Sequence, residues 1–228
     1  MAQPQPSYRP EERPAPTPLR AVSVEEQREA IAEANISSVA NPVPLGLTTY
    51  GIVTFLAGAV AAGFYAPASI GYLIPIGFLF GGVVQLLAGM WAFRKNDSLS
   101  ATVFSSYGAF WMAASVGLAM SGLGLVPAAI GGPLLGLYLA AFGAEVFYLW
   151  IASMRHSVSM AVVLGLLDLS LLLLCIGLFA PSTALVAAGG WAAIVSGICA
   201  GYTAAAHVIN DTFGSQALPI WPSRPPRR

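Results

Sequence analysis

Residues 45–93 read LGLTTYGIVTFLAGAVAAGFYAPASIGYLIPIGFLFGGVVQLLAGMWAF, a run of apolar and small residues without one charged side chain. A helix rises 1.5 Å per residue, so about 20 apolar residues cross roughly 30 Å of hydrocarbon, and this stretch is long enough for two crossings. Of all 228 residues, 57% are hydrophobic and only 9% are charged. Soluble domains carry about 25% charged residues. The composition therefore predicts an integral membrane protein.

The chain contains six apolar segments joined by short connections, and this stretch holds the first two. Their approximate limits are 45–66, 70–93, 101–124, 132–154, 158–180 and 183–208. Each is long enough to span a bilayer as a helix. We therefore expect an all-α integral membrane protein with six transmembrane helices, in a domain that covers residues 41–210.

The two ends of the chain differ from this domain in composition. Ten of the twenty charged residues lie before residue 34. We expect residues 1–40 to form a cytoplasmic, largely disordered tail with a short helix near 24–33, which begins at a capping box formed by Ser23 and Glu26. Residues 211–228 are expected to form a cytoplasmic C-terminal tail.

The basic residues predict the orientation. With six spans, both tails and the second and fourth connections share one side, and that side holds all ten Lys and Arg residues: Arg9, Arg13, Arg20, Arg28, Arg94, Lys95, Arg155, Arg224, Arg227 and Arg228. Cytoplasmic loops of membrane proteins are enriched in basic residues. Both termini are therefore expected in the cytoplasm.

Several classes of function are disfavoured. The formal net charge is zero, whereas nucleic-acid binders carry a basic face. Two cysteines and two histidines that lie far apart in the sequence form no metal site of recognisable spacing, and we find no phosphate-binding loop or nucleophile elbow. We expect no cofactor, no metal and no enzymatic activity.

Ionisable groups inside spans are expensive and are the first functional candidates. Glu145 and Asp168 lie about 13–15 Å from the cytoplasmic ends of spans 4 and 5, at similar depth. Two close carboxyls in a low-dielectric environment cannot both ionise, so this pair is a candidate proton-binding element. The alternative is that both are neutral acids, hydrogen-bonded to backbone or to a neighbouring subunit. His207, near the end of span 6, is either a proton relay or a helix-end residue at the interface.

Uncharged polar groups also lie within spans. The amide of Gln85 should face protein or water. Tyr50 and Tyr107 lie deeper than headgroup-level aromatic residues require, although an interfacial position remains an alternative.

Motifs that occur in order along the spans then narrow the function. They are NPVPLGL at 41–47, GGVVQLLAG at 81–89, SYGAFW at 106–111, LGLYL at 135–139, and a C-terminal set of Gly190-Trp191, Gly197, Asn210, Phe213-Gly214 and Leu218-Pro219. This series resembles the acetate uptake transporter family, which includes bacterial acetate–succinate permeases and the fungal acetate and ammonia-outward proteins. The resemblance covers about residues 41–220.

The resemblance implies a homohexamer whose protomers each enclose a pathway, with lipids or apolar side chains in the central hole. It implies a constriction of Tyr50, where bacterial relatives often have Phe, with Tyr107 and Leu167. It further implies polar substrate contacts and a residue linked to substrate size, which fall on Asn41, Gln85, Asn210 and Ala200. The chain departs from the family at Ala92 and His207, where relatives often have Glu, and in its acids Glu145 and Asp168. Two ionised carboxylates in the pathway would repel acetate, so they must be neutral, paired or outside it.

These observations favour transport of acetate and related short carboxylates, succinate among them, across the plasma membrane, most simply a bacterial inner membrane. Proton symport and an anion channel both remain open. The alternatives are a channel for ammonia or another small solute, and a membrane scaffold without transport.

Overall fold

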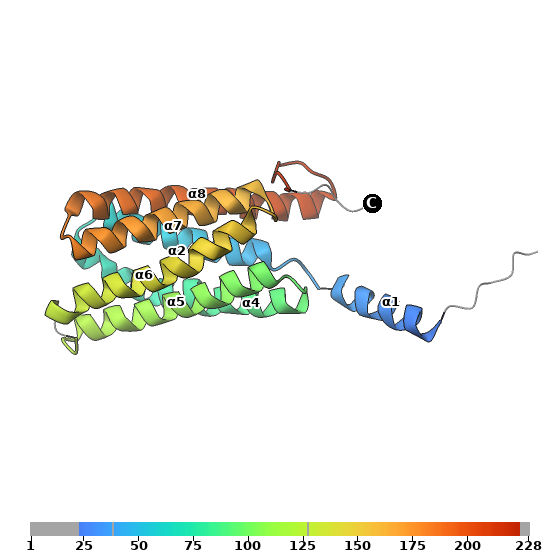
Figure 1. The fold of residues 1–228 in the computed structure, drawn as a ribbon, viewed down its shortest axis with the longest axis horizontal. Helices are drawn as coiled ribbons and strands as arrows, with labels where there is room; N and C mark the ends of the chain where they lie inside the picture. The colour runs from blue at the N-terminus through green and yellow to red at the C-terminus, as the bar shows by residue number, and fades with distance from the viewer. Residues whose placement is uncertain (1–22, 38, 127, 224–228) are drawn as a thin grey trace, which may run out of the picture. The chain divides into compact units, whose positions relative to one another are not determined.

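The computed structural model describes residues 23–37, 39–126 and 128–223, and within them the protein is all-helical (Figure 1). The disorder expected before residue 23 lies outside the described residues. The helices, in chain order, are α1 (Val24–Ser37), α2 (Val43–Ala61), the 3-10 helix η1 (Pro67–Tyr72), α3 (Leu73–Ile76), the π-helix η2 (Gly77–Val84), α4 (Gln85–Arg94), α5 (Ser98–Gly122), α6 (Ala128–Ser153), α7 (Val158–Phe179) and α8 (Thr183–Phe213).

The chain divides into two units, at Asn35. In the first, α1 begins with two reciprocal bonds: the Ser23 N–H donates to Glu26 Oε2 at 2.8 Å, and the Glu26 N–H donates to Ser23 Oγ at 3.1 Å. These bonds satisfy backbone donors that a helix start leaves unpaired.

The second unit carries the six predicted spans, and their number is confirmed within the described residues. Six helical segments are long and apolar enough to cross a membrane: Val43–Ala61, Leu73–Arg94, Ser98–Gly122, Gly132–Ser153, Val158–Phe179 and Thr183–Phe213. The last is longer than the sequence suggested, because the helix continues past 208 to a left-handed glycine, Gly214.

The second span is not a uniform α-helix. Its middle, η2, is a π-helix that carries Gly77, Gly81 and Gly82. Wide turns of this kind are rare and frequently mark functional sites. Here the turn places Gly81 directly against Trp111 of α5, where a Cβ would lie 2.9 Å from the ring.

Polar caps start the later spans and bring one end of the bundle together. Asp97 accepts from the Ser100 N–H at the start of α5, and Ser157 accepts from the Met160 N–H at the start of α7. The two connections meet where His156 Nε2 lies 3.9 Å from Asp97 Oδ2. Arg94 and Arg155 lie at the same two connections.

Helices α2 and α8 touch through glycines. A Cβ on Gly51 would lie 2.9 Å from the Gly197 carbonyl oxygen, and one on Gly197 would lie 2.7 Å from that of Gly51. Seven residues further on, a Cβ on Gly58 would lie 2.7 Å from the Gly190 carbonyl oxygen. Side chains at these positions would push the backbones apart, so glycine is what permits this packing in a membrane.

We expect Gly197→Ala to destabilise the protein by about 1–3 kcal/mol, as overpacking does, because the new methyl group meets rigid backbone. Gly201→Ala is the matched control: it lies one turn away on α8, and no atom lies within 4 Å of a Cβ built there. Thermal unfolding of both variants in detergent measures the difference. Equal stability of the two variants would contradict this account of the packing.

Candidate functional site

The three residues expected to form a constriction lie together inside the bundle. Tyr50 of α2, Tyr107 of α5 and Leu167 of α7 are all buried and line one small cavity of about 10 Å³. The two tyrosine rings meet edge to face, with centroids 6.1 Å apart. The remaining lining is apolar: Leu47, Val103, Phe104, Met160, Val163 and Leu164. A cavity of this size holds about one water at most, so the constriction is closed.

Tyr107 is fixed by an aromatic cluster between α5 and α6. Its ring stacks on Phe110, with centroids 5.2 Å apart, and meets Phe142 edge to face at 6.2 Å. Phe110 in turn stacks on Tyr138, whose hydroxyl donates to the Phe110 carbonyl at 2.7 Å. The Tyr107 hydroxyl itself is buried and has no hydrogen-bond partner within the described part of the chain. It is therefore a donor available to a solute.

Tyr50 is held differently. Its hydroxyl lies 2.6 Å from Ser196 Oγ of α8, and Ser196 Oγ donates to the Val163 carbonyl of α7 at 2.8 Å. These two consecutive hydrogen bonds join α2, α8 and α7 beside the cavity.

Gln85 lies at the level of Tyr107. Contacts one turn to either side set this register: Gly81 packs on Trp111, and a Cβ on Gly89 would lie 2.7 Å from the Ser105 backbone nitrogen. The Gln85 side chain is fully buried, and neither amide atom has a hydrogen-bond partner among the described residues. Buried amides are ordinarily paired, so Gln85 offers a donor and an acceptor to a solute in this layer.

Ala200 is fully buried on α8, where its Cβ would lie 3.4 Å from one built on Gly51. It packs directly behind the α2 backbone that carries Tyr50. A larger side chain at position 200 would press on that backbone and shift Tyr50. The size of residue 200 can therefore affect the width of the cavity.

The two asparagines expected in substrate contact lie apart from this layer. Asn41 Oδ1 accepts from the N–H of Val43, the first residue of α2, at 3.1 Å. Asn210 Oδ1 accepts from the Leu218 N–H, and Asn210 Nδ2 donates to the Leu218 carbonyl, both at 2.8 Å. With both ends of its amide engaged, Asn210 holds the C-terminal segment against α8.

The predicted proton-coupling residues do not line the cavity. Glu145 of α6 and Asp168 of α7 are both half-buried, and among the described residues no hydrogen bond joins them. Both are near enough to the Tyr107 hydroxyl to interact with it electrostatically. His207 is half-buried near the end of α8, with Asp211 one turn on.

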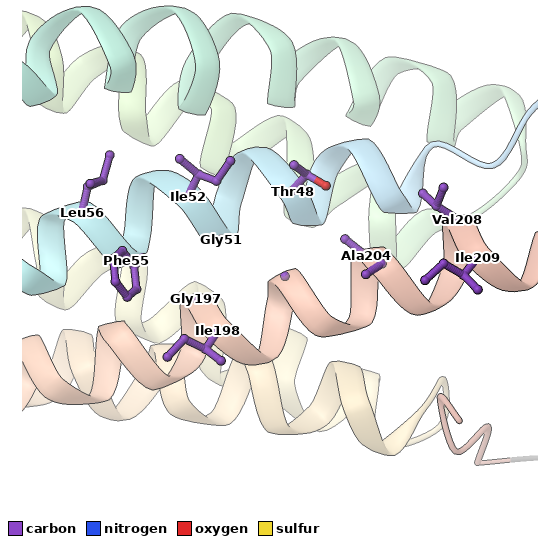
Figure 2. A pocket seen from close by; sticks show the side chains of 12 residues that line it. Thr48, Gly51, Ile52, Phe55, Leu56, Gly197, Ile198, Ala204, Val208 and Ile209 are labelled. Carbon is purple, nitrogen blue, oxygen red and sulfur yellow. The ribbon is translucent and has the colours of Figure 1, made fainter. Parts of the chain in front are cut away.

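A second, larger hollow lies between α2 and α8 on the outside of the bundle (Figure 2). It is an open groove of about 560 Å³ over the Gly51–Gly197 contact, and its walls are apolar side chains such as Ile52, Phe55 and Ile198. It has the chemistry of a surface that meets acyl chains or another apolar helix, not of a path for an anion.

Ser196 and Thr54 were not among the residues expected at the site, and Trp111 was expected only as the last residue of the SYGAFW motif. Ser196 binds Tyr50, while Thr54 Oγ1 and Trp111 Nε1 are buried without partners in the described part of the chain. The available signal was the rule that polar groups inside spans face protein or a cavity, but serines and threonines also bond to their own helix, as Thr203 does to the Cys199 carbonyl.

Comparison with known proteins supplies the remaining observations. The family model described as the GPR1/FUN34/yaaH family matches residues 25–222. The succinate-acetate/proton symporter SatP of Escherichia coli is 32% identical over 184 residues, which cover 81% of this chain and 96% of that protein. Acetate permease A of Emericella nidulans is 38% identical over 89 residues, covering 39% of this chain and 30% of that protein. The solved structure of the bacterial acetate channel SatP superposes with a TM-score of 0.76 at 32% identity, and the match covers 80% of this chain and 99% of that one.

We expect Leu167→Ala to widen the constriction and raise the passage of a dicarboxylate such as succinate relative to acetate. The same change removes buried apolar atoms and costs about 2–5 kcal/mol of stability, so the ratio of the two uptake rates is the quantity to measure. Leu172→Ala, an exposed leucine of the same helix, is the control and should leave the ratio unchanged. If succinate gains nothing in the Leu167 variant, that residue does not set the width.

Proposed function

We propose that this chain, which belongs to the GPR1/FUN34/yaaH family, carries acetate and related short carboxylates across the plasma membrane through the layer of Tyr50, Tyr107 and Leu167. Relatives named as a succinate-acetate/proton symporter and as an acetate channel support transport over enzymatic activity. The observation that supports this proposal is a closed apolar cavity inside six apolar helices, beside a buried Tyr107 hydroxyl that no group among the described residues satisfies.

The chemistry of acetate matches this layer. The methyl group suits walls such as Leu47 and Leu164, whereas the carboxylate must exchange its water for fixed donors. The Tyr107 hydroxyl and the Gln85 amide are such donors, and a hydrogen bond to an ionised acceptor is worth about 1.5–3 kcal/mol. The narrow, dry lining disfavours hydrated inorganic ions, because shedding water without replacement donors is costly.

The same proposal extends to orientation and assembly. We place both termini in the cytoplasm, because all ten basic residues of the sequence then share that side. We propose a homohexamer, supported by the family resemblance and by the apolar groove between α2 and α8, which a neighbouring protomer or lipid would cover. Native mass spectrometry of the purified protein counts the protomers.

The first test is uptake of labelled acetate into proteoliposomes. We expect the unchanged protein to transport acetate and Tyr107→Phe to lower the rate by at least about tenfold, since about 1.4 kcal/mol corresponds to a factor of ten and the lost bond to an ionised acceptor is worth about 1.5–3 kcal/mol. Tyr148→Phe, an exposed tyrosine of α6, is the matched control. Uptake of methylamine or ammonia but not acetate would favour the small-solute channel, and no flux of any solute would favour a scaffold.

The second test separates symport from channel. Acetate accumulation driven by an inward proton gradient indicates coupling, whereas equilibration alone indicates a channel. If Glu145 and Asp168 bind the coupled proton, Glu145→Gln and Asp168→Asn should abolish accumulation and retain equilibration, because an amide cannot take up a proton. Glu29→Gln, in α1, is the control. Accumulation that persists in both variants would remove these carboxyls from the coupling mechanism and leave His207 as the remaining candidate.

A further inference from the structure

The two tyrosines of the constriction are not equivalent, and a proton count at Ser196 shows why. A serine hydroxyl has one proton and accepts through its lone pairs. The Ser196 proton is directed to the Val163 carbonyl, at 2.8 Å. The contact of 2.6 Å between Tyr50 Oη and Ser196 Oγ must then use the tyrosine proton. Tyr50 therefore donates to Ser196 and presents only lone pairs to any other group.

This bonding has a consequence for the substrate. A carboxylate accepts hydrogen bonds and does not donate them, so the Tyr50 hydroxyl, with its proton committed, cannot solvate it. The Tyr107 hydroxyl has no protein partner in the described residues and keeps its proton free. Tyr107 thus offers a hydrogen-bond donor to the cavity, whereas Tyr50 offers only a fixed aromatic ring.

The bond also links the walls mechanically. Tyr50 belongs to α2, Ser196 to α8 and Val163 to α7, and both Tyr50 and Val163 line the cavity. Leu167 follows Val163 by one helical turn on the same face. A hydroxyl that joins α2 to α7 through α8 therefore sets how far Tyr50 stands from Leu167.

We infer that Ser196 is the positioning residue of the constriction: it holds Tyr50 as a fixed, non-donating wall and keeps the passage narrow enough for a short monocarboxylate. The inference rests on the proposed function, because width has an effect only on a solute that passes. Loss of the Ser196 hydroxyl would free the Tyr50 ring to turn and would release the tie between α2 and α7.

The test is a width series. Uptake of acetate, propionate and butyrate is measured for the unchanged protein, for Ser196→Ala, for Tyr50→Phe and for the double variant. We expect either single change to raise the butyrate-to-acetate ratio several-fold, and the double variant to raise it no further, because both changes break the same bond. Ser170→Ala is the matched control: Ser170 is a buried serine of α7 that donates to the Gly189 carbonyl at 2.8 Å and is not part of the cavity lining.

A merely structural role for Ser196 would lower all three rates together and leave their ratio unchanged, and that result would overturn the inference. Ratios that multiply in the double variant would overturn it as well, since they would mean that the two residues act independently.

Thermal unfolding of the same four proteins in detergent keeps this test separate from the proposed function. We expect non-additive shifts in Tm, as for two residues that share one interaction. If the unchanged protein takes up no carboxylate, the proposed function is wrong while non-additive shifts still support the hydrogen bond between Tyr50 and Ser196. Additive shifts would mean that the two residues share no hydrogen bond, and they would overturn the inference whatever the transport result.

Discussion

The structure depends on the contact between α2 and α8 through Gly51 and Gly197. In a membrane the lipid is as apolar as the helices, so close packing and interhelical hydrogen bonds must hold the bundle together. These glycines bring two backbones within van der Waals distance. Tyr50 and Ser196 each directly precede one of them in the chain, so the contact also sets the register in which their hydroxyls meet at 2.6 Å. The glycine contact that packs α2 against α8 therefore also positions Tyr50 as a wall of the cavity.

The buried polar groups on the other side of the cavity show the opposite behaviour. Tyr107 Oη, both amide atoms of Gln85 and Trp111 Nε1 have no partner in the described part of the chain. An unsatisfied buried polar group costs about 1–3 kcal/mol, and native structures retain few of them. These groups lie on α4 and α5, whereas on α2 the Tyr50 hydroxyl is bonded to Ser196 and Thr54 Oγ1 has no partner among the described residues. Buried polar groups without protein partners are available to a polar solute.

Much of the fold was predictable from sequence, because hydrocarbon thickness and backbone hydrogen bonding leave a chain this apolar few alternatives. The family resemblance also implied Tyr50, Tyr107 and Leu167 as neighbours, and these three residues lie together. Other features depend on tertiary contacts that no periodicity encodes. The π-helix at Gly77–Val84 fits Gly81 against Trp111, and the amide of Asn210 is engaged by a backbone eight residues further on. Ser196 shows the limit most clearly, because its role depends on two helices that are distant in sequence.

The proposed passage through the closed cavity requires one wall to move, and Tyr50, Tyr107 and Leu167 are held by interactions of different strength. Tyr50 is tied through Ser196 to a third helix, and Tyr107 is stacked on Phe110 with Phe142 at its edge. Aromatic pairs of this kind contribute about 0.5–1.5 kcal/mol beyond their buried area. Leu167 is held by dispersion contacts alone, each worth about 0.1–0.2 kcal/mol, and an aliphatic side chain changes rotamer within a small space. In the proposed pathway, two of the walls are therefore rings held in place, and Leu167 is the side chain that yields most easily to a passing solute.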